Sequence, residues 1–119
     1  MLDVNVAPAV FRGVAEMVDG LLEVHKLAVL AFGADRVEPI DFEPDWRRGS
    51  GDWRAWVFRV SVHGVSVWAW AGYEVTDYGG VECAGCGVCS EASGEWNNMD
   101  GETTDEWFAA LRESVLVTD

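Results

Sequence analysis

Two runs of alternating apolar residues, separated by His63-Gly64, constrain the fold of this chain more than any other feature. Together they cover residues 53–75. Alternation with a period of two is typical of half-buried β-strands, and a two-residue connection that contains glycine is typical of a tight hairpin turn. We therefore predict an antiparallel hairpin with one continuous apolar face that can seat a helix. That face would contain Trp56, Phe58, Val60, Val62, Val65, Val67, Ala69 and Ala71.

The opposite face of this hairpin is predicted to be aromatic, because the same turn pairs Val57 with Trp70 and places Trp68 and Trp53 on that side. A register slip of one residue would exchange the two faces. Seven tryptophans in 119 residues exceed what one small core needs. We expect Trp56 and Trp107 in the core and Trp68 and Trp70 beneath the C-terminal helix. The others, in or beside loops, would be interface anchors or small satellite clusters: Trp46, Trp53 and Trp96.

Helices are predicted at both ends of the chain. Between Pro8 and Gly33 the apolar residues recur at helical spacing, as they do on an amphipathic helix. Leu27 and Leu30 interrupt its polar side, which predicts that the last turn is covered all round. A short second helix is predicted near the C-terminus, where Thr103 and Glu106 have the spacing of a capping box.

Two further segments have less regular patterns. Residues 38–44 contain two prolines, which allow an edge strand or an extended connection but no central strand. Residues 76–102 hold six glycines, all three cysteines and no Lys or Arg, and we predict an irregular segment with room for a short strand over 78–83. The whole chain, residues 1–119, is expected to form one α+β domain. Its antiparallel sheet would have three or four strands, with the long N-terminal helix on one face and the short C-terminal helix on the other face or at an edge.

Charge limits the kinds of partner that the chain can have. It carries 21 Asp and Glu against 8 Lys and Arg, a net charge of −13. Residues 72–119 contain eleven acids and a single base, Arg112, which gives −10 over that part. This balance disfavours direct binding to nucleic acid or to an anionic membrane surface. Ten charges equal those of about 17 Å of duplex DNA, so an acidic face could occupy a groove that normally holds phosphates.

We therefore expect a small acidic antagonist that binds a basic protein surface, in particular that of a nucleic-acid-binding protein. In size and charge the chain is similar to phage anti-defence proteins that mimic nucleic acid, such as anti-CRISPR or anti-restriction inhibitors, and to toxin-neutralising immunity proteins. The expected contact residues are six acids around one apolar anchor, Trp96: Glu91, Glu95, Asp100, Glu102, Asp105 and Glu106. The oligomeric state is left open by the sequence.

The cysteines offer an alternative, a small binding module stabilised by zinc. Cys83, Cys86 and Cys89 have the spacing C-x2-C-x2-C, which resembles a metal knuckle. Structural zinc requires four ligands, and the fourth would be His63, His25 or an acid such as Glu82 or Asp77. Redox or iron–sulfur chemistry and a loop with ordinary thiols are the other interpretations. For His25 the simpler interpretation is a core or interface imidazole bonded to a backbone carbonyl.

The sequence carries no motif of a known catalytic site, neither a nucleophile elbow nor a zinc-protease or P-loop pattern. We therefore expect no enzymatic activity, and no cofactor beyond the zinc ion considered above. The longest apolar run, residues 27–32, is far shorter than a membrane span. The N-terminal residues lack the basic and apolar regions of an export signal. The expected location is the cytoplasm, that of the host cell if the gene belongs to a phage.

Overall fold

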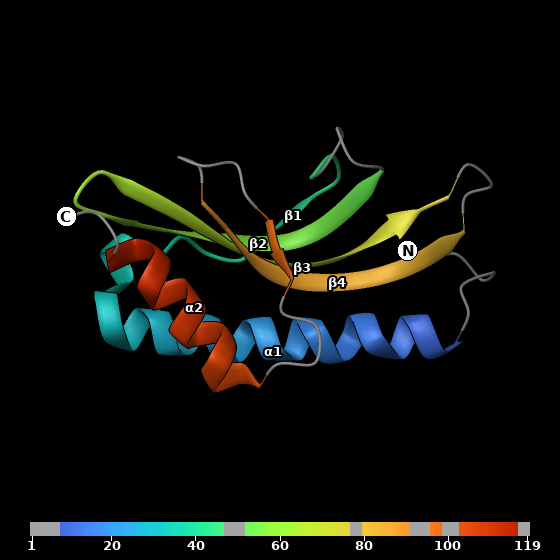
Figure 1. Cartoon of the computed structure of the whole chain (residues 1–119), viewed down its shortest axis with the longest axis horizontal. Coiled ribbons are helices and arrows are strands. Elements are labelled where there is room, and N and C mark those ends of the chain that lie inside the picture. Colours follow the sequence, from blue (N-terminus) through green and yellow to red (C-terminus); the bar gives the residue numbers. More distant parts are fainter. Residues whose placement is uncertain (1–7, 47–51, 77–79, 91–95, 99–102, 117–119) are drawn as a thin grey trace.

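The computed structural model describes residues 8–46, 52–76, 80–90, 96–98 and 103–116. Five strands form one antiparallel sheet in which each strand lies beside its neighbours in the sequence. A long helix precedes the sheet and a shorter one follows it (Figure 1). The elements in chain order are α1 (Pro8–Phe32), a 3-10 turn (Ala34–Arg36), β1 (Asp41–Glu43), β2 (Trp53–Val62), β3 (Val65–Val75), β4 (Val81–Ser90), β5 (Trp96–Asn98) and α2 (Thr104–Leu116). The predicted α+β class and antiparallel sheet are confirmed.

The β2–β3 hairpin has the predicted turn and register. Trp56 pairs with Ala71 and Val57 with Trp70, so the two predicted faces are present. His63 and Gly64 both have positive φ angles, 50° and 82°. A type I′ turn requires positive φ at both central positions, and its twist matches that of the flanking strands. The turn therefore fixes the register that assigns each side chain of β2 and β3 to a face.

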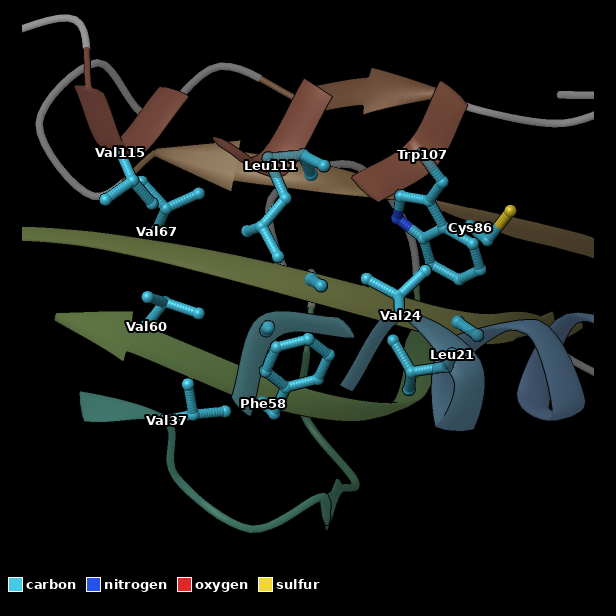
Figure 2. Packing of buried hydrophobic residues seen from close by; sticks show 14 of the residues in the cluster. Leu21, Val24, Val37, Phe58, Val60, Val67, Cys86, Trp107, Leu111 and Val115 are labelled. Carbon is cyan, nitrogen blue, oxygen red and sulfur yellow. The ribbon is translucent and has the colours of Figure 1, made fainter. Parts of the chain in front are cut away.

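One side of the sheet is covered by both helices (Figure 1). Leu21, Val24 and Ala28 of α1 are fully buried there. Side chains of α2 enter the same hydrophobic cluster, which Figure 2 shows from close by. Trp107 joins α2 to the sheet, because its indole Nε1 donates a buried hydrogen bond to the Gly87 carbonyl at 3.1 Å.

The position of α2 differs from the prediction. We expected the C-terminal helix on the face opposite the N-terminal helix or at an edge, with Trp68 and Trp70 beneath it, whereas α2 lies beside α1. The reason lies in β4, which widens the helix-bearing face with Cys86 and Val88 so that two helices fit. Trp68 and Trp70 lie on the other face.

The prediction of an irregular segment over residues 76–102 is wrong for the part that forms β4. This strand of ten residues pairs with β3 on one side and with β5 on the other. Gly85 on this strand makes room for two tryptophans, because a Cβ atom there would lie 3.3 Å from the rings of both Trp53 and Trp70. The sheet therefore has five strands, of which the outer two, β1 and β5, contain three residues each.

The face of the sheet opposite the helices carries a tryptophan cluster. Trp53 and Trp70 meet edge to face with ring centroids 5.7 Å apart, and Trp46 and Trp68 meet in the same way at 5.6 Å. Edge-to-face contacts are a favoured arrangement of aromatic rings. Trp46 and Trp53 thus belong to a satellite cluster on this face, which is one of the two interpretations that the sequence left open. The cluster also includes Ala55, Val57 and Cys89.

Candidate functional site

Three carboxylates form a row on the solvent side of α1. Glu16, Asp19 and Glu23 are all exposed. Steps of three and four residues keep side chains on one side of a helix. With a rise of 1.5 Å per residue, this row is about 10 Å long. The opposite side of the helix is buried against the sheet, so the backbone that carries the three carboxylates is held firmly.

The charges of this row are not neutralised within the part of the chain that the structure describes. Lys26 lies three residues after Glu23, a spacing that permits an ion pair, but no ion pair joins them there. The ion pairs between described side chains, Arg54 with Asp52 and Arg59 with Glu38, involve residues outside the two helices. The three carboxylates of the row on α1 are therefore exposed and form no ion pair with another described side chain.

Helix α2 adds three more exposed acids to the same layer: Asp105, Glu106 and Glu113. Of these, Glu106 also caps its helix, because the backbone N–H of Thr103 donates to its carboxylate at 3.2 Å and its own backbone N–H donates to Thr103 Oγ1 at 3.2 Å. The predicted capping box is thereby confirmed. We call the set of six the acidic helix surface: Glu16, Asp19, Glu23, Asp105, Glu106 and Glu113.

The acidic helix surface has few cations to offset it. Among the helical side chains that the structure describes, the exposed bases are Lys26 and Arg112. Six acids against two bases give this surface a net charge of −4. The α1 row lies outside residues 72–119, the part of the chain that carries most of the net negative charge. Its signal in the sequence was the helical spacing of the three acids, which total charge alone does not show.

The sequence-predicted contact residues are only partly described. Asp105 and Glu106 lie in the first turn of α2 and belong to the acidic helix surface. The backbone of Trp96 begins β5, but its side chain lies outside the description. The remaining four predicted acids lie outside the described residues: Glu91, Glu95, Asp100 and Glu102.

The three cysteines do not converge. All lie on β4, where successive side chains point to opposite faces of the sheet. Cys86 belongs to the core beneath the helices and Cys89 to the tryptophan cluster. Cys83 is exposed, and its thiol donates to the Glu74 carboxylate at 3.5 Å. Cys83 and Cys89 share a face but are six residues apart, about 20 Å along a strand.

This geometry does not fit a zinc knuckle, whose thiolates must all lie about 2.3 Å from one ion. The predicted fourth ligand, His63, is exposed in the β2–β3 turn. No cluster of three potential metal ligands occurs among the residues that the structure describes. None of the three cysteines forms a disulfide with another. The thiols are therefore distributed over both faces of the sheet.

His25 has the surroundings of a structural histidine. Its Nε2 donates to the carbonyl oxygen of Glu38 at 3.0 Å. Its ring meets Phe58 edge to face, with centroids 4.9 Å apart. This agrees with the interpretation of an imidazole bonded to a backbone carbonyl. The contact ties α1 to the segment that leads into β1.

Two leucines on α1 were not expected at the surface. The sequence predicted a last turn covered all round, but Leu30 is 84% exposed and Leu27 is only half-buried. Leu22, two turns earlier, is 48% exposed. The prediction failed because α2 crosses α1 on one side only, so the side that carries the acidic row is left uncovered. This side of α1 therefore combines charge with apolar area.

Comparison with protein-family models, with curated proteins and with solved structures found no match for this chain. No helix in the described part of the chain has the length and apolar character needed to cross a membrane.

Proposed function

We propose that this protein is a small acidic antagonist that binds the positively charged groove of a nucleic-acid-binding protein through the acidic helix surface. The observation that carries the proposal is the row of Glu16, Asp19 and Glu23, exposed and unpaired among the described residues. The proposal places this action in the cytoplasm of a bacterial cell, the phage's host if the gene is a phage's. It assigns the protein no catalytic residue.

The spacing of the row supports mimicry of a phosphate backbone. Its carboxylates follow one another at axial steps of about 4.5 and 6 Å. The phosphates of one DNA strand follow at about 3.4 Å along the duplex axis. The row thus has somewhat more than half the linear charge density of one strand, and α2 adds charge beside it. Such a field attracts a cationic groove over a distance and raises the rate of association.

The alternatives named from the sequence receive less support. A zinc-stabilised module would need thiols that converge, whereas those of β4 lie on opposite faces. A toxin-neutralising immunity protein would use the same kind of acidic surface, but its target need not bind nucleic acid. An assay that measures the release of a partner from DNA therefore distinguishes an antagonist of a nucleic-acid-binding protein from an immunity protein.

The test is a displacement assay. Proteins from a bacterial lysate are bound to double-stranded DNA resin at about 50 mM salt, and the purified acidic protein is added to elute them. We expect it to release one or a few DNA-binding proteins, which mass spectrometry identifies. Binding of the released protein should weaken by about tenfold or more between 50 and 300 mM salt, because the screening length falls from about 14 to about 6 Å.

A matched pair of variants assigns the effect to a surface. The first combines Glu16→Gln, Asp19→Asn and Glu23→Gln. Each exposed ion pair contributes a factor of about 1.4 to 5 in affinity, so this variant should bind about 3- to 150-fold more weakly. The control removes the same charge from the β1 region, with Asp41→Asn, Glu43→Gln and Asp45→Asn.

Three outcomes would contradict the proposal. One is that the protein releases nothing from the resin, and another is that the affinity for a released protein does not depend on salt. The third is that both triple variants bind equally, because the effect would then follow total charge and not the acidic helix surface.

A further inference from the structure

The exposed side of α1 combines leucines with the acidic row. Large hydrophobic side chains are mostly buried in the described part of the chain, and the exceptions are Leu22, Leu30, Phe42 and Leu116. Two of these four belong to α1, and Leu30 is the most exposed of them at 84%. Single exposed leucines are common on protein surfaces. Two on one helix face, beside three unpaired carboxylates, form a mixed surface that a partner can cover.

The spacing places these residues on one surface. Glu16, Glu23 and Leu30 are separated by seven residues each, and residues seven apart in a helix drift by only about 20° around the axis. They therefore form a line about 21 Å long. Leu22 lies beside this line, between Asp19 and Lys26 along the helix. The line begins with carboxylates and ends with the exposed leucine.

Building on the proposed function, we propose that this face of α1 docks as a helix in the groove of a basic protein, with Leu30 and Leu22 filling an apolar pocket and the carboxylates facing Lys or Arg on the groove wall. Helices that bind in grooves use apolar anchors one or two turns apart. Leu22 and Leu30 are eight residues apart, which places them on the same side of α1 about two turns from each other.

Charge complementarity decides the class of partner. A second copy of this chain would bring the same carboxylate row against itself, and each chain has a net charge of −13. Nucleic acid and anionic membrane surfaces would be repelled for the same reason. A cationic groove with an apolar pocket complements both the carboxylates and the leucines on this face of α1. The leucines then distinguish one basic protein from another, because carboxylates alone fit many cationic surfaces.

The two kinds of contact differ in their response to salt, and this difference makes the inference testable. The probe is the protein released in greatest amount from DNA resin, produced and purified. Its affinity for the wild type and for Leu30→Ala is measured at 50 and 300 mM salt. Removing three buried carbons should weaken binding about ten- to fiftyfold at both salt concentrations. The Glu16, Asp19 and Glu23 triple variant should instead lose most of its effect at the higher salt.

The matched control is Leu116→Ala, which changes an exposed leucine of α2. Alanine favours helix, so both leucine variants should fold with unchanged stability, and circular dichroism verifies this. We expect Leu116→Ala to bind like the wild type. Equal affinities of Leu30→Ala and the wild type would overturn this inference while the proposed function stands, as would an equal loss in both leucine variants. If no protein is released from DNA, the proposed function itself fails.

Discussion

Replacing Gly72 with alanine should destabilise the protein severely, because the pairing of β2 with β3 leaves no room for a methyl group. A Cβ atom at this position would lie 2.2 Å from the carbonyl oxygen of Arg54 and 2.8 Å from the Cα atom of Ala55. Both are backbone atoms of the paired strand, so neither can rotate away. Relief requires the two strands to separate locally by about 1 Å.

The size of the effect follows from what this separation breaks. Two or three ladder hydrogen bonds would weaken, at about 1 kcal/mol each. Residual strain of overpacking adds about 1–3 kcal/mol. We therefore expect a loss of about 3–5 kcal/mol in the free energy of unfolding. For a chain of this length, the melting temperature should fall by about 10–20 °C.

Thermal and urea unfolding, followed by far-ultraviolet circular dichroism, measure this loss. The matched control is Gly13→Ala, the same substitution in α1, where a Cβ atom would meet nothing within 4 Å. Alanine at this helical position should stabilise the protein by about 0.5–1 kcal/mol. The two substitutions thus have opposite expected signs. A Gly72→Ala protein within about 1 kcal/mol of the wild type would refute the close approach of β2 and β3.

Three further predictions concern α2 and the cysteines. Trp107→Phe removes the hydrogen bond to the buried Gly87 carbonyl and should cost about 1–3 kcal/mol in urea unfolding; an unchanged midpoint would contradict the packing of α2. Thr103→Ala removes the cap shared with Glu106 and should cost about 1 kcal/mol by the same assay, whereas Thr103→Ser should retain most of the stability. Native mass spectrometry without chelator should give the mass of the bare chain, and one bound zinc ion per chain would contradict the separation of the thiols.

The parts of the fold that the sequence predicted are those with strong local signals. The β2–β3 register follows from apolar alternation together with a turn at His63-Gly64, where both positions accept positive φ. Helix α1 follows from its periodic apolar side. In each case the pattern that a reader sees in the sequence is also the physical cause of the structure.

The parts that the sequence did not predict depend on contacts between distant residues. In β4, Gly85 interrupts the apolar alternation that marks a strand, because a Cβ atom there would crowd the rings of Trp53 and Trp70. Those rings come from β2 and β3, so nothing within β4 itself reveals the requirement. The face chosen by α2 depends likewise on Trp107, whose partner Gly87 lies on β4. The exposure of Leu30 depends on which side of α1 this second helix covers.

The arrangement of these layers also explains why the candidate surface lies on a helix. One face of the sheet is covered by α1 and α2, and the other face carries the tryptophan cluster. The edge strand β1 has three residues and lies between Pro39 and Pro44, which limits the addition of a further strand. The outward side of α1 is then a long regular surface that remains exposed. Because its inner side is anchored in the core, α1 holds Glu16, Glu23 and Leu30 at fixed spacing, and such a preformed surface loses less conformational freedom when it binds a groove.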